Sequence, residues 1–173
     1  MDLIVEAVAG STTGQAKLGQ KVFRCALGRS GIFAVKQEGD GATPVGRFSL
    51  RRVYYRPDKG LVPQTRLPTL ALSPADGWCD DIDSTAYNQH VTLPCPARHE
   101  EMWRNDALYD RVVVIGHNDS PIERGKGSAV FLHVARDDYG PTEGCVAFAK
   151  PDLDAILSEV GPDDFVTIRL ADR

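Results

Sequence analysis

The sequence has no long hydrophobic run, and its longest apolar stretches, such as Val112–Gly116, are short. None approaches the roughly 20 consecutive apolar residues that a helix needs to cross a bilayer. An excess of positive charge is also missing, because 20 basic and 24 acidic residues give a formal net charge of −4. We therefore expect no transmembrane segment and no nucleic-acid partner.

The amino-terminal segment lacks the basic start of a secretory signal. Met1–Gly10 has acids at Asp2 and Glu6 and contains no lysine or arginine, whereas a signal peptide begins with positive charge. Three situations fit this segment. The chain stays in the cytoplasm, a leader has been removed, or export follows a route that these residues do not reveal.

Cysteine is sparse, and no Cys-x-x-Cys pair occurs. A chain of 173 residues buries about two thirds of its unfolded surface, so it needs neither disulfides nor a metal to be stable. We expect no metal and no cofactor. The nearest metal-like grouping leaves a zinc protein as an alternative, although its spacing is not typical of zinc sites. That grouping consists of Cys79, His90, Cys95 and His99. Cys79 and Cys95 can also pair in an oxidising compartment.

The remaining composition is that of an ordinary globular protein, with 42% hydrophobic and 25% charged residues. We expect one domain over residues 1–173 and a monomer. Apolar and β-branched runs bounded by turn residues predict strands along most of the chain. These runs are Leu3–Val8, Lys21–Leu27, Ile32–Val35, Arg47–Tyr55, Leu67–Leu72, Val91–Leu93, Arg111–Ile115, Ala129–Val134 and Phe165–Leu170.

Helical patterns are fewer. Pro151–Val160 has one apolar stripe, starts with proline and is followed by Gly-Pro, so it predicts a helix. His99–Tyr109 is a second, shorter helix candidate. The sequence therefore predicts a mainly β fold, a β-sandwich or mixed sheet with one or two peripheral helices. Residues 56–110 are rich in loops and contain both tryptophans, and we expect them to form a lid or a substrate wall.

One segment, Phe131–Phe148, combines residues that suit nucleophilic catalysis. His133 is near the end of a predicted strand, and Cys145 follows twelve positions later, after a loop with Gly140, Pro141 and Gly144. A thiol beside an imidazolium is more readily a thiolate, and so a better nucleophile. A buried cysteine with a structural histidine is the ordinary interpretation of such a pair, but core cysteines seldom occur in a Gly/Pro/Thr turn.

Here the sequence resembles a known family. Thr142-Glu143-Gly144-Cys145-Val146 is similar to the Ser/Thr-His-Gly-Cys motif of the L,D-transpeptidase (YkuD-type) catalytic domain, and Phe131-Leu132-His133 matches its upstream histidine. Thr43–Phe48 resembles the early Thr-Pro-x-Gly-x-Phe segment of the same family. The likeness covers most of the chain.

The resemblance implies a cysteine acyltransferase of cell wall biogenesis that acts on peptidoglycan stem peptides, helps set cell shape and is a target of carbapenems. Cys145 would attack an L,D peptide bond of a stem tetrapeptide, with His133 as base, and an amine of a second stem would take the acyl group from the thioester. Gly144 and Thr142 would support the loop, with main-chain N–H groups at 144–145 facing the oxyanion. Family members act in the periplasm or cell envelope.

Two positions depart from the family pattern. The usual histidine two residues before the nucleophile is Glu143 here, and the arginine often found two residues after it is Ala147. A carboxylate about 6–7 Å from the thiol would disfavour the thiolate by roughly 0.6–2.5 kcal/mol. We therefore expect a divergent branch in which Cys145 and His133 keep their roles.

Substrate contacts are assigned from charge and position. Arg136 is a candidate for a substrate carboxylate, and we expect Tyr139, Asn118 and Trp78 to line the cleft. Asp80-Asp81 and Asp137-Asp138 are read as solvated charges, with the alternative that one pair reaches the cleft and binds an acceptor amine. Two further functions stay open: a cysteine L,D-carboxypeptidase, and a non-catalytic module that binds cell-wall peptides.

Overall fold

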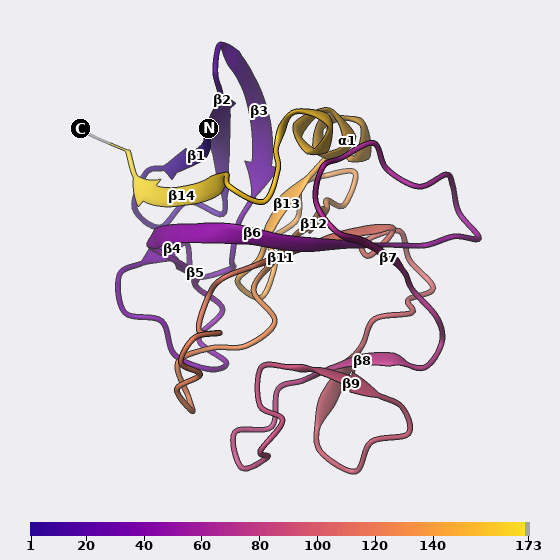
Figure 1. The fold of residues 1–173 in the computed structure, drawn as a ribbon. Coiled ribbons are helices and arrows are strands. Elements are labelled where there is room, and N and C mark those ends of the chain that lie inside the picture. The colour runs from indigo at the N-terminus through magenta and orange to yellow at the C-terminus, as the bar shows by residue number, and fades with distance from the viewer. Residues whose placement is uncertain (172–173) are drawn as a thin grey trace.

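The computed structural model describes residues 1–171, which contain fourteen strands and one helix (Figure 1). The elements in chain order are β1 (Asp2–Ala7), β2 (Thr13–Leu18), β3 (Lys21–Ala26), β4 (Ile32–Phe33), β5 (Thr43–Pro44), β6 (Gly46–Tyr55), β7 (Thr69–Ala71), β8 (Asp76–Cys79), β9 (His90–Thr92), β10 (His99–Glu101), β11 (Arg111–Ile115), β12 (Phe131–Val134), β13 (Val146–Phe148), α1 (Lys150–Glu159) and β14 (Phe165–Leu170). The fold is mainly β, as the sequence predicts.

The largest sheet is mixed and closes on itself. Its strand order is β11-β12-β13-β3-β2-β1-β14-β6-β7, and β6 also pairs with β11. Strand β6 is long enough to do both, because its first residues pair with β14 and the stretch Leu50–Tyr55 pairs with β11. The pairs β1–β14, β12–β13 and β6–β7 are parallel, while the other neighbours are antiparallel.

Strand β11 separates two hydrophobic clusters. Side chains alternate across a strand, so Val113 and Ile115 point into the main core while Val112 and Val114 point into a second cluster. All five residues of β11 are buried, which confirms the expectation from its unbroken apolar run. Strand β12 alternates in the same way, with Leu132 and Val134 in the main core and Phe131 in the second cluster.

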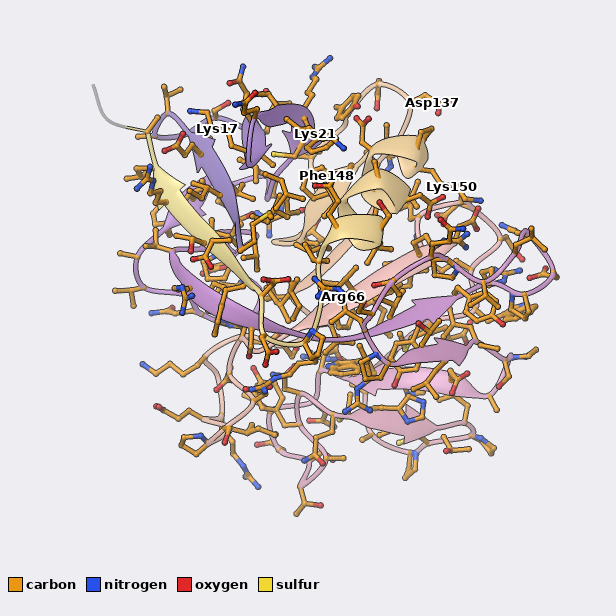
Figure 2. The ribbon with its side chains drawn as sticks, turned by 45° about the horizontal axis from the view of Figure 1, so that its top comes forward. Lys17, Lys21, Arg66, Asp137, Phe148 and Lys150 are labelled. Carbon is orange, nitrogen blue, oxygen red and sulfur yellow. The ribbon has the colours of Figure 1, made fainter. Side chains whose placement is uncertain are left out.

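Helix α1 covers one side of the main core. Its apolar stripe of Leu153, Ile156 and Leu157 is buried, and the fully buried ring of Phe148 belongs to the same cluster. Figure 2 shows Phe148 beside the helix and Arg66 near the opposite end of it from Lys150. The guanidinium of Arg66 donates to the carbonyl of Glu159 at 3.0 Å, which satisfies one of the unpaired carbonyls of the last turn.

A small sheet of order β10-β8-β9 lies across the long strand β6 from α1 (Figure 1). The prediction of a helix over His99–Tyr109 is therefore wrong. His99–Glu101 pairs with Cys79–Gly77 of β8, and the carboxylate of Asp106 then accepts the Leu108 N–H in a local turn. Long-range pairing and this turn override the apolar pattern that favoured a helix.

Several strands lack a clear signal in the sequence. Strand β2 reads TGQAKL and has polar residues on its outer side, so it is recognised only through its pairing with β1 and β3. Strand β13 has just three residues and begins directly after Cys145, so it connects the turn that contains Cys145 to the sheet. Over residues 1–171, no helix is long and apolar enough to cross a bilayer.

Candidate active site

Parallel pairing brings His133 and Cys145 to the same face of the sheet. Leu132 of β12 is opposite Val146 of β13, and His133 is opposite Ala147. Cys145 precedes β13 by one residue, so its side chain shares the face of His133 and Phe131 rather than that of Leu132. Both side chains line one cavity of about 1140 Å³ between the main sheet and the small sheet.

The sulfur of Cys145 is held by main-chain groups of the neighbouring segment. Its thiol donates to the carbonyl of Ala129 at 3.2 Å, and the N–H of Phe131 donates to Sγ at 3.3 Å. The residue is only 8% exposed. Burial and the negative charge of Glu100 raise the pKa of this thiol to about 12, against the opposing effects of the Phe131 amide and Lys36. The resting group is thus the neutral thiol.

The imidazole of His133 is oriented by a carbonyl. Its Nδ1 lies 2.8 Å from the carbonyl oxygen of Val134, so the tautomer that donates from Nδ1 leaves Nε2 free to accept a proton. The ring also meets the ring of Tyr109 edge-on at 5.4 Å between centroids. Burial lowers the pKa of His133 to about 4, and the cations of Arg104 and Arg136 act in the same direction.

These two pKa values correct one expectation. A thiol with a pKa of about 12 and an imidazole with a pKa of about 4 in the same cavity do not form a thiolate–imidazolium pair at neutral pH. Both shifts oppose transfer of the proton from the thiol to the imidazole before the attack. The proton must therefore leave sulfur as the sulfur attacks, rather than beforehand.

The loop before the nucleophile is fixed by Thr142 and Gly144. The Thr142 hydroxyl donates to the carbonyl of Cys145 at 2.7 Å and accepts the N–H of Gly144 at 3.1 Å. Gly144 has φ +137°, and a Cβ there would lie 2.7 Å from the carbonyl oxygen of Ala42. Only glycine fits this position. Because the Gly144 N–H is already bonded to Thr142, it does not serve as the expected oxyanion donor.

The early Thr-Pro segment supports this loop from the other side. The N–H of Gly28 donates to the hydroxyl of Thr43 at 2.8 Å, and the main chain of Thr142 bonds to Leu27 and Arg29 on either side of Gly28. The two segments that resemble the family in sequence are thus packed together.

Glu143 points away from the thiol, contrary to the expectation of a charge beside it. Its side chain is 81% exposed and accepts a hydrogen bond from Nε of Arg29 at 2.9 Å. The carboxylate that acts on Cys145 is Glu100, which the sequence analysis did not single out. Glu100 is on β10, and its Oε1 accepts the hydroxyl of Tyr109.

Of the four residues that the sequence predicts as substrate contacts, only one lines the cavity. Arg136 lines the cavity, is exposed and donates to the carbonyl of Pro141 at 3.2 Å. Tyr139 instead packs its ring under the guanidinium of Arg24 at 4.4 Å. Asn118 holds its own loop through the carbonyls of Glu123 and Gly127. These last two side chains are outside the cavity lining.

Trp78 is a core residue and not a wall of this cavity. It is 8% exposed, meets Phe131 edge-on at 5.0 Å and donates its indole N–H to Asn88. Residues 56–110 do supply one wall of the cavity, mostly through polar side chains. The side chains of this segment that line it are Asp80, Asp81, Ile82, Asp83, Arg98, His99, Glu100, Arg104, Leu108 and Tyr109.

The zinc alternative has no support in the geometry. His90 contacts Asp76, and His99 contacts the carbonyl of Ala97. Within residues 1–171, no three His, Cys, Asp or Glu side chains gather as a set of metal ligands. Cys79 is buried, Cys95 is partly exposed, and both are free thiols.

Comparison with known proteins agrees with this geometry. The family model named YkuD, described as the L,D-transpeptidase catalytic domain, matches residues 12–168. Neither the curated proteins nor the solved structures include a significant match. The matched range contains Thr43, His133 and Cys145 and nearly every element of the fold. The chain belongs to the family of L,D-transpeptidase catalytic domains.

Proposed function

We propose that this protein is a peptidoglycan L,D-transpeptidase that works through a thioester on Cys145. The observation that carries the proposal is the common cavity of Cys145 and His133, on one face of adjacent parallel strands. Peptidoglycan lies outside the cytoplasm, so the proposed place of action is the cell envelope. Residues 1–173 are taken as a single catalytic domain.

The first half-reaction follows from the resting state of the site. The S–H leaves the Ala129 carbonyl and turns toward Nε2 of His133, which takes the proton as sulfur attacks the carbonyl of the L,D bond. The N–H of Cys145 is the proposed donor to the oxyanion. His133 then gives its proton to the departing D-residue, and a thioester remains.

Arg136 is the proposed contact for a carboxylate of the donor. Its guanidinium lines the cavity and bonds only a main-chain carbonyl among the described residues, and guanidinium groups bind carboxylates in two-pronged geometry. This would supply the contact that the family's arginine makes where this chain has Ala147.

The alternative of a carboxypeptidase uses the same first step, with water as the acceptor. A non-catalytic module is disfavoured because a peptide-binding groove needs neither a thiol nor a base. The deciding experiment mixes the purified protein with disaccharide-tetrapeptide and analyses the muropeptides. A new dimer supports the transferase, whereas a tripeptide alone supports the carboxypeptidase. If neither forms, the proposed function is wrong, and Cys145→Ala serves as the inactive control.

A further inference from the structure

The cavity lining carries six carboxylates and four lysine or arginine side chains, and most of its carboxylates already have partners. The carboxylate of Glu38 accepts the hydroxyls of Tyr87 and Ser128. Asp80 forms an ion pair with Arg98. The carboxylate of Asp81 accepts the main-chain N–H groups of Asp83 and Arg98. The carboxylate of Glu143 forms an ion pair with Arg29. From the sequence, amine binding by Asp80-Asp81 is the alternative to solvated charges. In the structure these two carboxylates are occupied by groups of the protein itself.

Glu100 has fewer partners than these groups. It is partly buried on β10, one oxygen accepts the Tyr109 hydroxyl, and within residues 1–171 no basic side chain forms an ion pair with it. Glu38 and Asp81 also lack an ion pair, but each accepts two hydrogen bonds.

The guanidinium of Arg104, whose charge acts on Glu100, is itself held by both oxygens of Asp106 at 2.8 and 2.7 Å. A partly buried carboxylate without a cation is costly in free energy. A cationic ligand would offset this cost.

A cation bound by Glu100 would lie in the cavity that also holds the reacting sulfur. Glu100 lines the same cavity as Cys145 and His133, and its charge is felt at the thiol. Tyr109 connects the two sides, because its hydroxyl bonds Glu100 while its ring contacts the ring of His133. An incoming ammonium group would thus find the carboxylate of Glu100 in the same cavity as the thioester on Cys145 and the base His133.

We propose that Glu100 binds the ammonium group of the acyl acceptor and so favours an amine over water in the second half-reaction. The inference rests on the proposed function, since it concerns the fate of the thioester on Cys145. Glu100 would then determine whether the thioester is transferred to an amine or hydrolysed by water.

The proton balance of this step is complete. The bound ammonium gives one proton to the Glu100 carboxylate, and burial raises the pKa of this carboxyl and so favours the transfer. The neutral amine attacks the thioester carbonyl, and a carbon–nitrogen bond forms. The nitrogen loses its second proton to Nε2 of His133, which passes it to sulfur as the carbon–sulfur bond breaks. Glu100 finally releases its proton to solvent.

The test measures how the acyl-enzyme divides between two products. Wild type, Glu100→Gln and Asp83→Asn are each incubated with disaccharide-tetrapeptide, and the ratio of cross-linked dimer to tripeptide is determined. Asp83 is a matched control, because it is an exposed carboxylate at the same cavity that forms no ion pair in residues 1–171. This ratio does not depend on the rate of acylation, so a variant that only slows formation of the thioester leaves it unchanged.

Glu100→Gln is expected to lower the dimer-to-tripeptide ratio roughly tenfold, because an amide binds an ammonium more weakly than a carboxylate does. Asp83→Asn is expected to keep the wild-type ratio. Tyr109→Phe retains the carboxylate and is expected to give an intermediate ratio. A wild-type ratio in Glu100→Gln overturns the inference while leaving the proposed function intact. Absence of any acyl-enzyme on wild-type Cys145 overturns the proposed function instead.

Discussion

The carboxylate of Glu143 forms an ion pair with Arg29 at 2.9 Å on the surface, although the next residue but one is the nucleophile. The side chain of Glu143 is directed out of the loop, so most of its field is screened by water and by the guanidinium. The charge that opposes ionisation of Cys145 comes instead from Glu100, which is far away in the sequence.

Replacing these two glutamates should have different effects on the thiol. Glu100→Gln removes a charge that raises the pKa of Cys145, so alkylation by iodoacetamide at pH 8 should be roughly 3- to 10-fold faster than in wild type. Glu143→Gln should change the rate by less than about twofold. Mass spectrometry of the Cys145 peptide gives both rates. A larger effect for Glu143→Gln than for Glu100→Gln would contradict this assignment.

The stability of the protein should depend on pH through His133. Its pKa is lowered from 6.5 to about 4 in the fold, so the unfolded chain binds a proton between these values and the folded chain does not. The free energy of unfolding should therefore fall by up to about 3 kcal/mol as the pH drops from 6.5 to 4. Denaturant titrations measure this fall.

The matched variant for that measurement is His133→Gln, which carries no titrating group. Its free energy of unfolding should change less over the same window, even though His117, whose pKa burial also lowers, remains in place. Equal slopes for wild type and His133→Gln would show that the imidazole is not held in the neutral form.

The Thr142 hydroxyl should be needed for the loop. Thr142→Val keeps the shape but removes the bonds to Cys145 and Gly144, leaving buried main-chain groups unpaired. We expect a loss of about 2–4 kcal/mol in the free energy of unfolding, with a lower rate of thioester formation. Thr142→Ser keeps the hydroxyl and should retain most of the free energy of unfolding and most of the rate of thioester formation. If Val and Ser behave alike, the hydroxyl does not organise the loop.

If Cys145 is the proposed nucleophile, a carbapenem should acylate it, because an attacking thiol would open the strained lactam amide. The intact mass should rise by the mass of the drug, and Cys145→Ala should show no adduct. Because the resting thiol is neutral, the reaction needs His133, and His133→Gln should slow it by at least roughly a hundredfold. An unchanged mass of wild type after long exposure would argue against an activated thiol.

The sequence predicts the parts of this protein that depend on local pattern. The apolar run of Arg111–Ile115, the alternation of Phe165–Leu170 and the stripe of Pro151–Val160 each locate an element to within one or two residues. The motif around Cys145 and the histidine of β12 identify the family. Short-range periodicity and turn chemistry suffice for these features.

Contacts between distant segments are not visible in such patterns. Glu100 and Tyr109 share a cavity with Cys145 only because β10 pairs with β8 and the small sheet faces the main one. Trp78 has an aromatic ring that suits sugar binding, but its neighbours Phe131 and Asn88 place it in the core. Likewise, the short sequence distance predicts that the carboxylate of Glu143 lies near the thiol, whereas its ion pair with Arg29 directs the side chain outward.

The central claim is that acyl transfer passes through the sulfur of Cys145, and trapping the intermediate tests it directly. Wild type is mixed with disaccharide-tetrapeptide, quenched in acid within the first turnovers and digested for mass spectrometry. The Cys145 peptide should carry the donor without its terminal D-residue, and Cys145→Ala should form neither adduct nor product. Product formation by Cys145→Ala, or turnover by wild type with the acyl group on another residue, would contradict the account.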